Sequence, residues 1–142
     1  MSGDLVDEAQ GPKIVLRQLA AIRIGATQDW SVEWEVENQG DDRLRILTAR
    51  LPHGQFKSKE LRFEPPIALA ARAQVNFRVS VRCNEPSGVV TENAFVIFQV
   101  IWSGEPWRIF ARIRVIVTHD ERLETATESI TTQRVGFSGV ST

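Results

Sequence analysis

The stretch NAFVIFQVIWSGEPWRIFARIRVIVT, residues 93–118, decides the fold of this chain. In its second half, residues 107–117, apolar side chains recur at every second position. Because side chains alternate across a β-strand, one face of this strand is expected to be buried. The first half, residues 94–102, is apolar on both faces except at Gln99, which favours a central strand. Residues 103–106, with the sequence SGEP, have the composition of a turn, so the stretch predicts a β-hairpin.

Length and composition exclude several classes of protein. The chain has 142 residues, enough for one domain with its own core, and its 17 basic and 18 acidic residues nearly balance. Such a balance gives no net field to attract a nucleic acid, so we expect no nucleic-acid partner. There is no apolar signal region at the N-terminus and no run of about 18 apolar residues, so we expect no membrane span. The single cysteine, Cys83, favours a reducing compartment, and we predict a cytoplasmic protein.

Further strands are expected on both sides of the hairpin. Residues 1–11 are polar and predict a flexible N-terminal arm. Residues 13–24 could form one strand with a bulge near Leu19 and Ala20, two short pieces, or a short helix. The remaining predicted strands alternate in polarity and cover residues 29–37, 44–51, 60–64 and 73–83.

The links between these strands are also predicted. Residues 38–42 have turn chemistry, so we expect the strand 44–51 to pair with the strand 29–37. The strand 60–64 is expected at a sheet edge, stopped by Pro65 and Pro66, because proline cannot donate to a ladder. The Ser/Thr-rich residues 119–142 predict a loosely ordered tail.

This pattern predicts an all-β fold, an antiparallel immunoglobulin-like β-sandwich of about seven strands over residues 12–118. The segment Val36-Glu37-Asn38-Gln39-Gly40-Asp41 resembles bacterial immunoglobulin-like domains of the CARDB (cell-adhesion-related) type. By strand order the resemblance extends over residues 13–118. It implies an accessory or interaction role and provides no catalytic residues.

One charge pattern supports that topology. In an immunoglobulin-like sandwich, the strand 29–37 lies beside the strand 73–83. The outward face of the first carries glutamates and that of the second carries arginines, and opposite charges on neighbouring strands favour pairing. The residues are Glu33, Glu35 and Glu37 on one strand, and Arg78 and Arg82 on the other.

Catalytic and metal sites are not expected. His53 and His119 are the only side chains suited to acid–base catalysis at neutral pH, and both fall in predicted loops. Cys83 continues the inward face of its strand, which favours a buried structural thiol over a nucleophile paired with a histidine. Asn38, with Asp41 and Asp42, could ligate calcium, but a solvated turn explains these residues better. We therefore predict that the protein is not an enzyme and uses no cofactor or metal.

A binding surface is predicted on the outer side of the hairpin, where apolar side chains are edged by arginines. Aromatic residues rimmed by arginine are typical of protein-binding hot spots, so we expect a protein partner or a homo-oligomer. Another part of the same chain could instead cover this face. The predicted surface comprises Phe95, Ile97, Ile101, Phe110 and Ile116, with Arg108, Arg112 and Arg114 at its rim.

The alternative function is a carbohydrate- or small-ligand-binding module. Trp102 and Trp107 flank the hairpin turn and could form a stacking platform if their faces are exposed. The same pair could equally be a cross-strand packing contact, which is common in hairpins.

Overall fold

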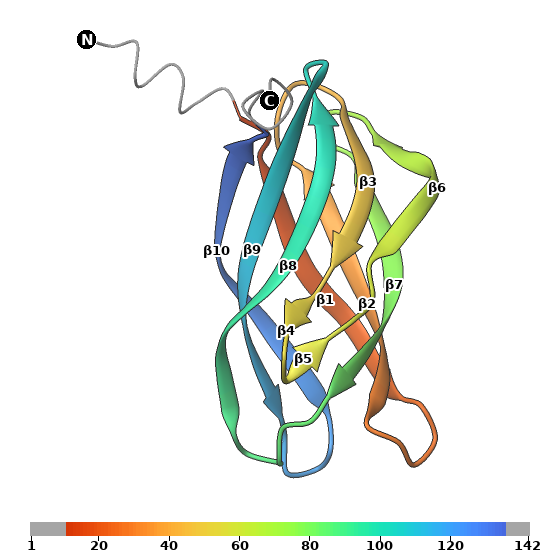
Figure 1. Cartoon of the computed structure of the whole chain (residues 1–142), viewed down its shortest axis with the longest axis vertical. Coiled ribbons are helices and arrows are strands. Elements are labelled where there is room, and N and C mark those ends of the chain that lie inside the picture. Colours follow the sequence, from red (N-terminus) through yellow and green to blue (C-terminus); the bar gives the residue numbers. More distant parts are fainter. Residues whose placement is uncertain (1–10, 136–142) are drawn as a thin grey trace, which may run out of the picture.

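The computed structural model describes residues 11–135, which fold into two antiparallel five-stranded sheets packed face to face (Figure 1). Sheet A has the strand order β1-β2-β7-β5-β4, and sheet B the order β10-β9-β8-β3-β6. The strands are β1 (Ile14–Arg23), β2 (Asp29–Asn38), β3 (Leu44–Arg50), β4 (Pro52–His53), β5 (Phe56–Lys57), β6 (Leu61–Leu69), β7 (Gln74–Cys83), β8 (Val90–Trp102), β9 (Glu105–Val117) and β10 (Leu123–Arg134).

The all-β class and the antiparallel two-sheet arrangement are confirmed. The strand count is ten within the described residues rather than about seven. Two of the added strands, β4 and β5, are two-residue pieces too short to leave a periodic pattern in the sequence. A third is β10, which pairs with β9 along its whole length.

The predicted central hairpin is formed by β8 and β9, which pair from Val90 to Trp102. Its two-residue turn has positive φ at Ser103 (53°) and Gly104 (77°). Positive φ at both positions matches the right-handed twist of the flanking strands. The inward side chains of β9 are buried as their alternation predicts.

β1 is a single strand with a register shift between Gln18 and Ala20, as one of the three predicted alternatives had it. β2 follows the predicted alternation, and Trp30, Val32 and Trp34 are buried in the core. β2 also lies beside β7, and the outward charges pair across them: Arg78 lies 3.5 Å from Glu33.

The predicted pairing of β2 with β3 is wrong. Residues 39–43 carry the chain from sheet A to sheet B, so β3 pairs with β6 and β8 instead. The turn residues in this segment are compatible with a hairpin or with a crossing. The crossing places the inward side chains of β3 in the core between the sheets, where Leu44 and Ile46 are buried.

β6 lies at the edge of sheet B as predicted, but the prolines do not end it. The strand continues from Leu61 to Leu69, and its pairing with β3 shifts register between Ile46 and Thr48. Pro65 and Pro66 fall within this irregular part, where no ladder hydrogen bond needs their missing N–H groups.

The predicted loosely ordered tail is wrong for residues 123–134, which form β10. Leu123 is buried and Ile130 packs against the core. Two side-chain hydrogen bonds tie β10 to β1 of the other sheet: Gln18 Nε2 donates to Leu123 O (2.8 Å), and Thr127 Oγ1 donates to Leu16 O (2.9 Å). The predicted arm, apart from Gly11, and the last seven residues lie outside the described part of the chain.

The two ends of the described chain meet at one end of the sandwich. β1 begins where β10 finishes, as Figure 1 shows in red and blue. Residues 11–14 share a small surface depression with Ile130 and Thr132. The N–H of Val135 also donates to Pro106 O in β9 (3.0 Å).

Candidate functional site

The outer face of sheet B brings together the residues predicted to bind a partner. Directly paired residues on neighbouring strands project from the same face. Phe110 of β9 is paired with Ile97 of β8, and Arg112 is paired with Phe95. The predicted surface therefore exists as one face, formed mainly by β8 and β9.

This face is less apolar at its surface than the sequence suggests. Ile97 is buried (9% exposed), while Phe95, Ile101, Phe110 and Ile116 are half-buried. No described strand lies over them, because the sandwich has only two layers. The face therefore offers less apolar surface than full exposure of these side chains would, and its role in binding stays a prediction.

Besides Arg114, five arginines lie on this face, three of them from strands that the hairpin sequence does not include. The register places Arg50 opposite Ile97, and Arg45 opposite Ile101. We call these five residues the arginine face. They are Arg45 and Arg50 on β3, Arg62 on β6, and Arg108 and Arg112 on β9.

None of these five guanidinium groups forms an ion pair within residues 11–135. Within the same residues, only one of the five forms a side-chain hydrogen bond: Arg112 Nη1 donates to Asn93 Oδ1 (3.3 Å). Their direct cross-strand partners are apolar or neutral polar residues, not carboxylates: Phe95, Ile97, Gln99, Ile101, Thr48, Ser129, Gln133 and Ala68. The arginine face is thus a local concentration of positive charge on a chain whose net charge is −1.

The charge changes toward the far end of the same sheet. Arg114, the third arginine of the predicted rim, lies 3.5 Å from Glu92 and 3.1 Å from Glu128. Glu124 lies one step further, opposite Ile116. This acidic end sets a boundary to the arginine face.

Sheet A shows the opposite arrangement on its outer face. Arg17 lies 2.6 Å from Glu35 and 3.2 Å from Glu37, and the hydrogen bond from Arg17 to Glu35 raises the pKa of the guanidinium. Arg82 lies 3.2 Å from Asp29. With the Arg78–Glu33 pair, every outward arginine at the centre of sheet A has a carboxylate partner.

Trp102 and Trp107 form an edge-to-face pair at the end of the hairpin, with ring centroids 5.7 Å apart and planes at 88°. Both rings belong to the inward face, and Trp107 is 8% exposed. The guanidinium of Arg134 lies 5.4 Å from the Trp107 ring. The geometry is that of a packing contact, with Trp107 buried and Trp102 half-buried.

The predicted reactive groups lie apart. Cys83 is buried, and this burial raises the pKa of its thiol. His53 lies in β4, where its Nδ1 accepts a hydrogen bond from the N–H of Gln55 (3.2 Å). His119 is exposed beside Gly88. Within the described residues, no group of three His, Cys, Asp or Glu side chains is placed to hold a metal ion.

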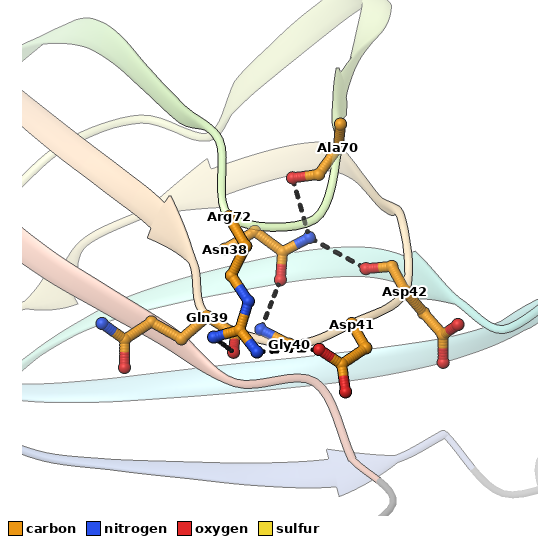
Figure 2. A network of polar contacts seen from close by, with 7 residues as sticks. All are labelled: Asn38, Gln39, Gly40, Asp41, Asp42, Ala70 and Arg72. Atoms are coloured by element: carbon orange, nitrogen blue, oxygen red, sulfur yellow. Dashed lines mark hydrogen bonds and ion pairs between the residues drawn. The ribbon is translucent and has the colours of Figure 1, made fainter.

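Asn38, which the sequence places in a turn, is a buried structural link between three segments (Figure 2). Its Nδ2 donates to the carbonyls of Asp42 (2.9 Å), Leu69 (3.1 Å) and Ala70 (3.2 Å). Its Oδ1 accepts a hydrogen bond from the N–H of Gly40 (3.0 Å), so both ends of the amide group hold backbone groups of the turn.

Arg72 completes this link from the β6–β7 turn. Its Nη1 donates to Gln39 O (2.9 Å), and its Nη2 lies 2.8 Å from Asp41 Oδ1. The backbone N–H of Arg72 donates to Asn38 O (2.9 Å). The carboxylate of Asp41 therefore already has an arginine partner. This pairing supports a structural turn over a calcium site.

A groove of about 700 Å³ lies where residues 57–61 run past β7. Its charged lining combines four basic side chains with two acidic ones: Lys57, Lys59, Arg78 and Arg82 with Asp29 and Glu60. Beyond Lys57, β7 pairs only with β2, so its other edge has no neighbouring strand in the described chain. No pattern in the sequence indicates this groove, because it depends on where β5 separates from β7.

No model of a known protein family matches the chain. A search of curated proteins found no significant match. Among the described residues, nothing helical has the length and apolar character that a membrane crossing requires.

Proposed function

We propose that this chain is a non-catalytic protein-interaction module that binds a partner protein through the outer face of sheet B. The observation that supports this most is the combination of half-buried Phe95, Ile101 and Phe110 with arginines that form no ion pair within residues 11–135, on a sheet face that no described strand covers. Aromatic and arginine side chains together are enriched in protein-binding hot spots.

A partner protein is favoured over a second copy of the chain. In a two-fold dimer the same face is used on both subunits. Two arginine faces would then meet, and like charges brought together at an interface oppose association. A heterologous partner avoids this repulsion.

We also propose a finer architecture: the sandwich is immunoglobulin-like, as the resemblance to CARDB-type domains implies. The neighbours β1, β2 and β7 in one sheet, opposed by β9, β8 and β3 in the other, support it. A cytoplasmic location and the absence of catalysis belong to the same proposal. The single buried cysteine is compatible with a reducing compartment.

The proposal is tested by site-specific photocrosslinking in cells. Benzoylphenylalanine replaces Phe110 in one variant and Asn76 in another. Asn76 is an exposed residue on the outer face of sheet A, and it serves as the matched control. We expect a covalent adduct with a defined protein from position 110 and none from position 76. No adduct from position 110, or the same adduct from both positions, would overturn the proposal.

A further inference from the structure

We infer that the partner surface recognised by the arginine face is an acidic polypeptide segment in which carboxylates alternate with apolar side chains. This inference rests on the proposed function, since it uses the same face and names the chemistry of the partner. It concerns Arg45, Arg50, Arg62, Arg108 and Arg112.

The first support is the contrast between the two outer faces. The chain carries 18 acidic residues, enough to match its 17 basic ones. On sheet A, Arg17, Arg78 and Arg82 each lie within 3.5 Å of a carboxylate. On sheet B, five arginines lie opposite neutral side chains and form no ion pair within residues 11–135. The unmatched charge is therefore a local property of one face and not a shortage of acids.

The second support is the mutual placement of the positive groups. Arg108 and Arg112 are separated on their face by Phe110 alone, since successive outward residues are two apart along a strand. Arg50 lies in the row that contains Phe110 and Ile97. Like charges gathered on one sheet face repel, and carboxylates from a partner would remove that repulsion.

The third support is the chemistry of the guanidinium groups and of the apolar side chains between them. A guanidinium presents a planar fork that matches a carboxylate in a two-bond geometry, which makes arginine the usual partner of acids at interfaces. Between the guanidinium groups, the half-buried rings of Phe95 and Phe110 and the side chain of Ile101 offer apolar contact. A segment with carboxylates alone would leave this apolar surface unused.

A polyphosphate chain fits this face less well than a polypeptide. Nucleic acids need positive charge that continues along the backbone. Here the arginine face ends at Glu92, Glu124 and Glu128, and Arg114 is already held by two of them. The apolar side chains between the arginines also have no counterpart on a phosphate backbone.

The test measures binding of a fluorescein-labelled random copolymer of glutamate and tyrosine to the full chain by fluorescence anisotropy. Polyglutamate and an oligothymidylate are measured in parallel. The variant Arg50→Gln/Arg108→Gln removes two charges from the arginine face. The matched control Arg78→Gln/Arg82→Gln removes two charges from sheet A. Circular dichroism confirms that each variant folds.

We expect the copolymer to bind more tightly than polyglutamate and the oligothymidylate, with an affinity that falls as salt is added. The Arg50→Gln/Arg108→Gln variant should bind at least about ten-fold more weakly, because truncating charged contacts weakens such interfaces strongly. The control variant should change by less than about two-fold, since rim or remote charges contribute little.

Three results would overturn the inference. Equal losses in the two variants would show non-specific attraction. Tighter binding of the oligothymidylate would assign the face to nucleic acid. A gain of about ten-fold in copolymer binding on replacing Asp4, Asp7 and Glu8 by Asn, Asn and Gln would assign the face to the chain's own N-terminal residues.

Failure of this inference can be distinguished from failure of the proposed function. If position 110 still gives its adduct in cells while the arginine variants leave both the adduct yield and copolymer binding unchanged, the face binds a protein that is not acidic. If position 110 gives no adduct, the proposed function itself fails.

Discussion

Asn38 shows how much one side chain can determine at the point where the chain leaves sheet A for sheet B. It is 1% exposed, and its amide group satisfies carbonyls from the crossing segment and from the β6–β7 turn. Aspartate would place a negative charge against the same carbonyls. Alanine would remove one donor from each of them, and Ala70 O would keep only the N–H of Ala73. The position therefore requires both the shape and the polarity of asparagine.

We predict that Asn38→Ala lowers the free energy of unfolding by about 2 kcal/mol, the cost of leaving buried acceptors unsatisfied. Asn38→Asp should lower it further. Urea denaturation followed by tryptophan fluorescence measures both. The control Asn76→Ala, at an exposed position, should stay within about 0.5 kcal/mol of the wild type. Equal effects at the two positions would show that the link at Asn38 is not needed for stability.

Cys83 leads to a prediction about reactivity and pH. Burial raises the pKa of its thiol, so the thiolate is disfavoured in the folded state. The stability that comes from burying the protonated thiol is complete below the pKa of the unfolded thiol, about 8.5. It is lost as the pH rises through the higher pKa of the folded state. Cys83→Ala should remove this part of the alkaline destabilisation.

The same burial predicts that a thiol reagent modifies the native protein at pH 8 about a hundred-fold more slowly than the protein in guanidinium chloride. Absorbance of the released thionitrobenzoate measures both rates. Rapid modification of the native protein would show instead that the end of β7 opens readily.

Among the elements, the β8–β9 hairpin could be predicted almost completely and β10 could not. The hairpin combines strict alternation with turn residues, and these local signals agree with the tertiary structure. In β10 the inward positions include Thr125, Thr127 and Thr132 in place of large apolar residues. A hydrophobic pattern misses such a strand, because the register shift between Thr127 and Ser129 also breaks its alternation. Its β-branched threonine and isoleucine residues are themselves a strand signal.

The turn of this hairpin gives a prediction with an internal control. Gly104 has a φ of +77° and no atom within 4 Å of an added Cβ, so Gly104→Ala costs only backbone strain. We expect a loss of about 1 kcal/mol in unfolding free energy. Gly54 also has open space around it but no positive φ, so Gly54→Ala should be neutral or slightly stabilising. Thermal denaturation compares the two variants, and equal losses would contradict the turn geometry.

For the whole molecule, the sequence predicts the two layers and which hairpin residues share the outer face of sheet B, but not the arginines that other strands add to that face. Arg108 and Arg112 lie within the hairpin, so their place at the rim of the predicted surface follows from the alternation of one strand. Arg45, Arg50 and Arg62 join them only through the register of β3 and β6. A register between distant strands has no local signal in one sequence, and the predicted β2–β3 pairing would have placed β3 in the wrong sheet.

The unequal distribution of charge predicts chromatographic behaviour. At pH 7 the wild type, with a net charge of −1, should be retained on a sulfonate cation exchanger at low salt through its arginine face. Arg108→Gln/Arg112→Gln should elute at clearly lower salt than Arg78→Gln/Arg82→Gln, although the net charge changes equally. Identical elution of the two variants would show that the resin senses no difference between the two faces.

The meeting of the two described chain ends at one end of the sandwich has a mechanical consequence. A tension applied through residues 11 and 135 would pull β1 and β10 sideways from their sheets, so their ladder hydrogen bonds would break one after another. Domains pulled lengthwise must instead break a whole ladder at once. We therefore expect this domain to yield at low force in single-molecule stretching, which suits a binding element better than a load-bearing link.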